Sequence, residues 1–260
     1  MSYTLEKEYP IAVFDSGVGG ISVLRELVKL MPNEDFIFFG DSKNAPYGTK
    51  SLEAVRALTL AHAKELFDAG AKGLVVACNT ATSAAVRILR EKYPDIPIGG
   101  IEPAVKPAVY CKEHPVVLVM ATPMTIREEK FKRLCSRYED KGEIIPLPCP
   151  GLMDFVERGD LNSDSLRSYL EELLFAHRNH PVDSVVLGCT HYPFVRDMIQ
   201  EVLGPDVVVY DGGEGTAREM RRRLAEADLL NPSEEKGIVD FQNSLQDEAK
   251  IELCKKLLNG

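Results

Sequence analysis

The sequence predicts an α/β protein with two similar lobes, each a mainly parallel sheet flanked by helices. Three observations support this prediction. Short β-branched runs alternate with amphipathic stretches along the chain, which is typical of βαβ units. The series of strands starts twice, near residues 11 and 116. In each series the third strand runs into a cysteine turn, LVVACNTATS (74–83) and VVLGCTHYPF (185–194).

The first series contains four expected strands. They lie at residues 11–14, 36–40, 74–77 and 96–101. Helical patterns follow the first three strands, the second of them after a polar loop. These patterns read ISVLRELVKL, SLEAVRALTLAHAKELFDAG and ATSAAVRILREKY.

The second series repeats this order. Its strands are expected at residues 116–120, 143–147, 184–188 and 207–211, with a helix over SDSLRSYLEELLFAHRNH (163–180). The pattern alone does not assign the stretch after Gly212 to either lobe. With the family resemblance described below, we expect a first lobe of residues 1–101 plus 212–260 and a second lobe of residues 102–211.

Composition narrows the class of protein. The 260 residues are 45% hydrophobic, and no apolar run is long enough to span a bilayer. The N-terminal stretch carries Glu6 and Glu8 and lacks the apolar block of a signal peptide, so we expect a cytoplasmic protein with no membrane contact. A net charge of −9 argues against nucleic acid as the main partner. Six cysteines without a CxxC pair predict neither a disulfide framework nor a zinc site.

The residues at the strand ends share a chemical character. In open parallel sheets, ligands bind outside the carboxyl ends of the strands. Here these ends carry hydroxyls, amides and glycines, and helix N-termini follow. Such groups offer N–H and O–H donors to an anion without a dedicated arginine, so we expect a small carboxylate ligand. The group includes Asp15, Ser16, Tyr47, Gly48, Cys78, Asn79, Thr80, Thr122, Thr125, Cys189, Thr190 and His191.

Two of the cysteines differ from the other four. A free cysteine is usually a small core residue, but Cys78 and Cys189 each lie at a strand-to-helix turn, where a helix N-terminus lowers a thiol pKa from about 8.5. Asp15 could serve Cys78, and His191 lies two residues from Cys189. This pattern suggests two-base chemistry in a cleft between the lobes, in which one thiolate removes a proton from carbon and the other thiol delivers one to the opposite face.

The chain resembles the glutamate racemases of the cofactor-independent aspartate/glutamate racemase superfamily. The resemblance covers residues 11 to about 220 and rests on FDSGVGGISVL, GDSKNAPYG, VACNTATSAA, GIEPAV, LGCTHYPF and DGGEGTARE. It implies two α/β lobes with the active site between them. It also implies interconversion of L- and D-glutamate for peptidoglycan, without pyridoxal phosphate or metal.

The resemblance also implies roles for individual residues. Cys78 would deprotonate D-glutamate and Cys189 L-glutamate, with Asp15 and His191 as helpers and Glu157 in FVERGD as a further carboxylate. The implied substrate contacts are Asp15, Ser16, Tyr47, Gly48, Asn79, Thr80, Thr122, Thr125, Thr190 and His191. The C-terminal segment would return to the first lobe. Family members commonly carry serine where this chain has Gly212.

Other functions fit part of the pattern. An aspartate or other amino-acid racemase of the superfamily would have the same cysteines and a different side-chain pocket. A decarboxylase of the superfamily, which works with one cysteine, is disfavoured because both positions are filled. A two-lobed binding protein would need neither thiol. A pyridoxal phosphate enzyme using Lys43 lacks a recognisable phosphate site. The sequence is also compatible with a homodimer.

Overall fold

The computed structural model describes residues 3–177 and 182–260 and divides into two compact units. The first unit comprises Met1–Ile101 and Gly213–Gly260, and the second comprises Glu102–Gly212. The end of the helix expected over 163–180 and the first two residues of the N-terminal stretch lie outside the described residues.

The sheet of the first unit is parallel throughout. Its order is β4-β3-β1-β2-β9, so β1 lies at the centre. All five residues of β1 are buried, as expected for a short apolar strand covered on both faces. The bounds are β1 (Ile11–Asp15), β2 (Phe36–Gly40), β3 (Gly73–Val76), β4 (Ile98–Gly100) and β9 (Val239–Asn243).

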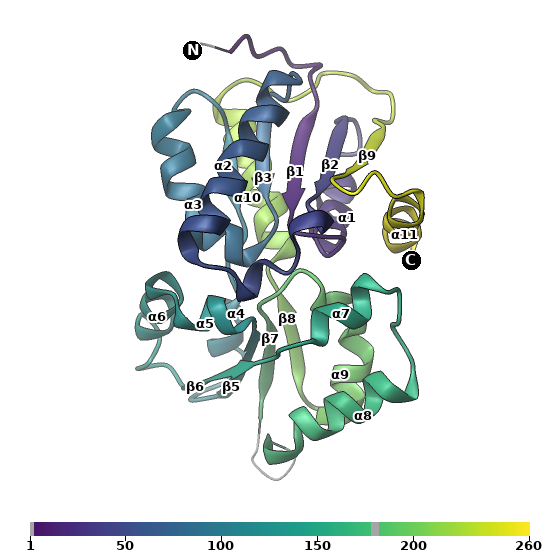
Figure 1. Cartoon of the computed structure of the whole chain (residues 1–260). Coiled ribbons are helices and arrows are strands. Elements are labelled where there is room, and N and C mark those ends of the chain that lie inside the picture. The colour runs from purple at the N-terminus through teal and green to yellow at the C-terminus, as the bar shows by residue number, and fades with distance from the viewer. Residues whose placement is uncertain (1–2, 178–181) are drawn as a thin grey trace. The chain divides into compact units, whose positions relative to one another are not determined.

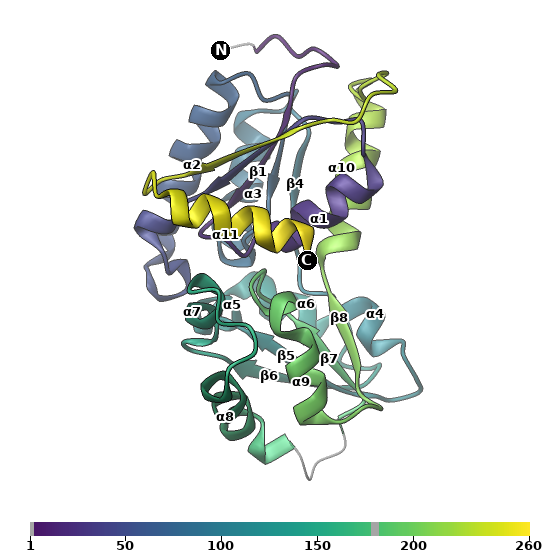
Figure 2. The ribbon, with the colours of Figure 1, turned by 90° about the vertical axis from the view of Figure 1, so that its right-hand side faces the viewer.

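Helices cover both faces of this sheet. Helices α2 and α3 pack together on one face, and α1, α10 and α11 lie on the other (Figures 1 and 2). The change of face between α1 and α2 follows from right-handed crossovers that run first outward from β1 to β2 and then back to β3. The helices are α1 (Ile21–Leu30), α2 (Leu52–Asp68), α3 (Asn79–Lys92), α10 (Gly213–Glu226) and α11 (Glu248–Asn259).

The second unit has a four-stranded parallel sheet in the order β6-β5-β7-β8. On one face, α4 and Phe131 of α6 form a buried cluster with Val117, Val119 and Val186. The strands are β5 (Val116–Ala121), β6 (Glu143–Pro148), β7 (Ser184–Leu187) and β8 (Val208–Asp211). The helices are α4 (Val105–Val109), α5 (Pro123–Arg127), α6 (Glu129–Ser136), α7 (Leu152–Glu157), α8 (Asp164–Leu173) and α9 (Arg196–Leu203).

The two sheets share one topology. Numbered from the start of each series, both read fourth, third, first, second strand, and the first unit adds β9 at the β2 edge. Each of the expected strands overlaps a strand of the structure. Two parallel sheets flanked by helices confirm the predicted fold class.

Two local features differ from the sequence expectation. Strand β9 was not expected, because VDFQN is short, lies at a sheet edge and is only partly buried. The last three residues of CTHYPF form, with Val195, the 3₁₀ turn η4 (Tyr192–Val195), and the α-helix begins only at Arg196. Among the described residues, none of the helices combines the length and apolar character needed to cross a bilayer.

Candidate active site

The motif DSGVGG places a buried carboxylate at the end of the central strand β1. Asp15 is fully buried, and its Oδ2 accepts a hydrogen bond from the backbone N–H of Gly17 at 3.1 Å. Gly20, the N-cap of α1, lies so close to this side chain that an added Cβ would lie 2.6 Å from the Asp15 Cβ. The glycine is therefore required for close packing. Ser16, beside Asp15, is also buried.

Cys78 caps the N-terminus of α3. Its Sγ accepts a hydrogen bond from the N–H of Ala81 at 3.5 Å, and the residue is 6% exposed. Ala77 donates to the carbonyl of Phe14 at 2.8 Å, so the ends of β3 and β1 place Cys78 and Asp15 at neighbouring positions. A helix N-terminus favours a thiolate, which makes Cys78 a candidate base. Thr80 lies buried in the same first turn.

Asn79, the residue after Cys78, has an amide whose hydrogen-bonding capacity is unused. The residue is 5% exposed, and within the described part of the chain neither Oδ1 nor Nδ2 has a hydrogen-bond partner. A buried amide left without partners costs about 1–3 kcal/mol. Its position beside the thiol indicates a polar ligand that completes these bonds.

The loop after β2 carries Tyr47 and Gly48 in the 3₁₀ turn η2 (Tyr47–Thr49). The hydroxyl of Tyr47 donates to Oδ2 of Asp41 at 2.6 Å, and both residues are buried. Burial and this bond raise the pKa of Tyr47, and the nearby Cys78 and Asp15 act in the same direction, so the phenol stays neutral. Gly48 is half-buried beside it.

In the second unit, three side chains form a continuous chain of polar contacts. Cys189 lies two residues beyond β7, as Cys78 lies two beyond β3, and is 7% exposed. Its Sγ is 3.6 Å from Nδ1 of His191, and Nε2 of His191 is 2.8 Å from Oε1 of Glu157. Glu157 is the last residue of α7. In such an arrangement the imidazole can accept the thiol proton, and the carboxylate can stabilise the protonated imidazole.

The charges around His191 support that interpretation. Burial alone would lower the pKa of His191, but the Cys189 sulfur and the Glu157 carboxylate outweigh it and hold the pKa well above its ordinary value. A protonated imidazole places a positive charge beside the Cys189 sulfur. Thr190 Oγ1 lies 3.4 Å from the same Nδ1.

Thr122 and Thr125 lie together at the end of β5. Their hydroxyls are 2.9 Å apart, and Thr122 caps α5 by accepting from the N–H of Thr125 at 3.2 Å. Both residues are buried. They therefore form the start of a helix at the same sheet end as Cys189, since β5 and β7 are neighbours.

The site residues predicted from the sequence thus fall into two groups, one in each unit. The first group is Asp15, Ser16, Tyr47, Gly48, Cys78, Asn79 and Thr80. The second is Thr122, Thr125, Glu157, Cys189, Thr190 and His191.

Two residues beside these groups, His62 and Tyr192, were not predicted from the sequence. Asp41 belongs to the same GDSKNAPYG motif as Tyr47 and accepts a hydrogen bond from its hydroxyl. His62, which lies outside that motif, contacts Asp41. Cys149, interpreted as an ordinary packing residue, is buried with Tyr192, whose hydroxyl donates to its carbonyl at 3.3 Å. Burial raises the pKa of the Cys149 thiol, which leaves it protonated and suited to packing. The spacing along the chain held no signal for these contacts.

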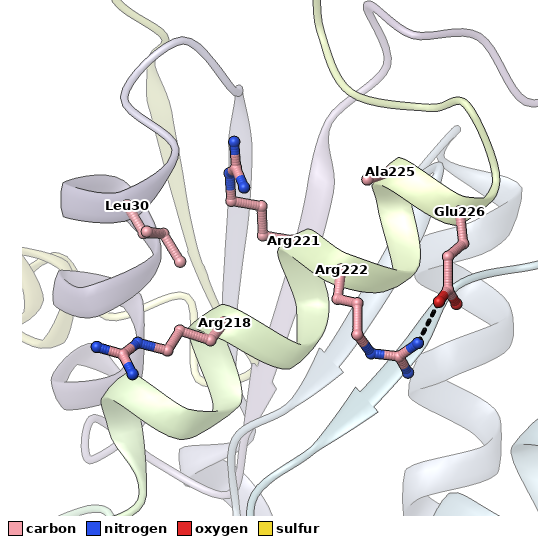
Figure 3. A pocket seen from close by; sticks show the side chains of 6 residues that line it. All are labelled: Leu30, Arg218, Arg221, Arg222, Ala225 and Glu226. Atoms are coloured by element: carbon pink, nitrogen blue, oxygen red, sulfur yellow. Dashed lines mark hydrogen bonds and ion pairs between the residues drawn. The ribbon is translucent and has the colours of Figure 1, made fainter.

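The arginine-rich helix α10 lies apart from these groups in the sequence and lines a surface hollow in the first unit. Figure 3 shows Arg218, Arg221 and Arg222 with Leu30 of α1 at this hollow. Arg222 pairs with Glu219 at 2.8 Å and also with Glu226. Such pairing is typical of a solvated helix face. Among the described residues, no cluster of His, Cys, Asp and Glu has the form of a metal site.

Fold and site together define a class: α/β proteins of repeated topology in which each parallel sheet presents a cysteine turn after its third strand. Residues 11–220 match the Asp/Glu/Hydantoin racemase family. The chain is 51% identical to a glutamate racemase of Clostridium perfringens over 97% of both chains.

Solved structures agree. A glutamate racemase of Francisella tularensis in complex with D-glutamate has a TM-score of 0.84 at 28% identity, covering 98% of this chain and 95% of that one. One from Escherichia coli in complex with L-glutamate and an activator has a TM-score of 0.82 at 29% identity, covering 96% and 94%. This chain belongs to the Asp/Glu/Hydantoin racemase family, which confirms the resemblance found in its sequence.

Proposed function

We propose that the protein is a glutamate racemase that interconverts L- and D-glutamate through two cysteines. The observation that carries the proposal is the matched position of Cys78 and Cys189, each two residues beyond the third strand of its sheet. A protein that only binds an amino acid needs no such thiols. Relatives and solved structures that are glutamate racemases support glutamate as the substrate.

In the proposed reaction, the Cys189 thiolate takes the Cα proton of L-glutamate and becomes a thiol. The Cα–H electron pair stays on the substrate as a carbanion, and the Cys78 thiol donates its proton to the opposite face. The product is D-glutamate with Cys78 as thiolate, and the reverse direction starts from that state. His191 and Glu157 support Cys189, and Asp15 serves Cys78.

Substrate binding falls to the remaining polar residues of both groups. The Asn79 amide and the first turn of α3, with Thr80, suit a carboxylate oxygen, since they offer N–H and O–H donors. Ser16, Tyr47, Gly48, Thr122, Thr125 and Thr190 are proposed as further contacts. None of these steps calls for a cofactor, and cofactor independence stays a prediction.

The test is incubation of the purified protein with L-glutamate in D₂O without added cofactor, followed by optical rotation and by NMR of deuterium at Cα. We expect loss of rotation together with deuterium incorporation. Cys78→Ala and Cys189→Ala should each reduce racemisation by about 10²–10⁴-fold or more, the range typical of acid–base catalysis. Turnover like that of the wild type in either variant would reject the two-base mechanism.

The same assay separates the alternatives. Faster turnover of aspartate than of glutamate would favour an aspartate racemase of the same superfamily. Tight glutamate binding without exchange at Cα would favour a binding protein. We further propose that the enzyme works in the cytoplasm and supplies D-glutamate for peptidoglycan. A homodimer remains an expectation, which light scattering of the same sample would test.

A further inference from the structure

A buried carboxylate in the first unit has no role in the proposed proton transfers. Asp41 directly follows β2, is fully buried and donates its N–H to the carbonyl of Asp15 at 2.9 Å. Its Oδ2 accepts from the Tyr47 hydroxyl at 2.6 Å, and Nδ2 of Asn44 lies 3.1 Å from both of its oxygens. The carboxylate therefore ties two points of the 42–49 loop to the end of the sheet.

The positive charge that faces the Asp41 carboxylate comes from His62, on a helix that covers one face of the sheet. Nε2 of His62, on α2, lies 3.1 Å from Oδ2 of Asp41, as a charge pair rather than an aligned hydrogen bond. The side chain of His62 is 14% exposed, and its ring packs on Phe14 and Phe39 with centroids 5.7 Å and 4.9 Å away. A buried carboxylate without a counter-charge is costly. His62 supplies that charge when its ring is protonated.

Charged groups approach His62 from two elements. Asp41 faces Nε2 from the end of β2, and Glu65, on α2 itself, lies 2.9 Å from Nδ1. Tyr47 reaches the same carboxylate as a neutral phenol, and Ser244 follows β9 as a neutral neighbour of Asp41. Burial alone would lower the pKa of His62, but the two carboxylates outweigh it and raise the pKa above its ordinary value. The charge pair is therefore complete at low pH and is lost as pH rises through the raised pKa.

We propose that His62 is a positioning residue, which acts through Asp41 to hold Tyr47 and Gly48 where they bind the substrate. The inference rests on the proposed function, because it needs this loop to contact glutamate. His62 itself touches neither the substrate nor the reacting thiols in this scheme. Its loss is therefore expected to act on KM and to leave kcat nearly unchanged.

The decisive variant is His62→Gln, compared with Glu65→Gln as a matched control that removes only the outer partner of the same ring. At pH 6 we expect KM for glutamate to rise about tenfold in His62→Gln, with kcat within about twofold of wild type. The KM ratio of His62→Gln to wild type should fall towards one as pH rises, because the wild type then loses its own charge pair. Glu65→Gln should keep the wild-type KM at pH 6. Because its His62 has a lower pKa, it should lose the charge pair, and with it the low KM, at a lower pH than the wild type does.

Two measurements do not depend on turnover. NMR titration of His62 should give a pKa above that of a free histidine, reduced in Glu65→Gln. Hydrogen exchange of the 42–49 amides should quicken in His62→Gln. Tyr47→Phe removes only the hydroxyl donor, and its KM effect should not add to that of His62→Gln in the double variant, because both loosen one loop.

The possible failures are distinguishable. A wild-type protein that racemises glutamate, with an unchanged KM and pH profile in His62→Gln, overturns the positioning role and leaves the proposed function standing. A wild-type protein without racemisation defeats the proposed function, and the proposal that His62 positions residues that bind glutamate falls with it. Unchanged exchange of the 42–49 amides in His62→Gln overturns the positioning role in either case.

Discussion

At the scale of single residues, the two groups hold their reactive atoms by different means. Cys78 relies on the first turn of α3, whose Ala81 N–H reaches its sulfur. Cys189 relies on side chains, through His191 and Glu157. The Ala81 contact is a backbone dipole, which does not titrate. The second arrangement includes a histidine, whose ordinary pKa lies near neutral pH, so we expect the environment of the second thiol to respond to pH in that range.

Glu157→Gln tests that response. The variant keeps a hydrogen-bonding group beside His191 but removes the negative charge, so the pKa of His191 should fall. A histidine whose pKa is raised on folding adds stability below its unfolded pKa, and this stability is lost as pH rises through the folded pKa. The loss of unfolding free energy in Glu157→Gln should therefore be largest at acidic pH and shrink with rising pH. Urea unfolding at several pH values measures it, and a loss independent of pH would contradict the assignment.

Asn79→Ala should stabilise the folded protein and weaken its binding of glutamate. The amide is buried without partners among the described residues, so its removal should raise the free energy of unfolding by about 1 kcal/mol. If the amide binds a substrate carboxylate, KM for glutamate should rise about tenfold or more. Thermal unfolding and steady-state kinetics of the same preparation give both values. A less stable variant with unchanged KM would argue that Asn79 is structural.

At the scale of elements, the strand that the sequence did not predict supports the loop that carries Tyr47. Strand β9 ends at Asn243, whose Nδ2 donates to Ser42 Oγ at 2.9 Å. The following Ser244 accepts from the N–H of Lys43 at 2.9 Å. A segment some 200 positions away in the chain therefore holds the start of the 42–49 loop.

Ser244→Ala should raise KM about three- to tenfold with little change in kcat, since one hydrogen bond is worth about 1 kcal/mol. Gln242→Ala, on the strand that Ser244 follows, is the matched control, because the Gln242 amide donates to Asp240 and not to the loop. Equal effects of the two substitutions on KM would mean that β9 supports the sheet edge in general rather than this loop.

At the scale of the whole molecule, a buried ion pair joins distant parts of the first unit. Nζ of Lys72 lies 2.5 Å from Oε2 of Glu34, and both side chains are buried. Lys72 also donates to the carbonyl of Lys7, and Oε1 of Glu34 accepts from the N–H of Asn231 at 2.9 Å. The N-terminal segment, the sheet and the C-terminal tail therefore meet at one pair of charges.

Lys72→Met should destabilise the protein by about 3–5 kcal/mol, because it leaves the Glu34 charge buried and unpaired. The double variant Lys72→Met with Glu34→Leu should recover much of this loss, since neither charge then remains. Lys64→Met, on an exposed ion pair with Asp68, is the control and should change stability little. Urea unfolding measures all three, and a double variant no more stable than Lys72→Met would show that the pair is not the cause.

The local chemistry and the order of the elements other than β9 follow from the sequence alone. Alternation of apolar runs and helical patterns predicts both sheets, because strands covered on two faces must be apolar throughout. The cysteine turns are contiguous, so motifs alone place Cys78 beside Asn79 and Cys189 beside His191.

The contacts between segments distant in the chain became visible only in the folded structure. It brought Glu157 to His191, His62 to Asp41 and Ser244 to Lys43, pairs separated by 34, about 20 and 201 positions. The physical reason is that short polar segments such as VDFQN carry too little apolar area to specify their own place. A sheet edge or a buried charge supplied by the rest of the fold specifies it instead.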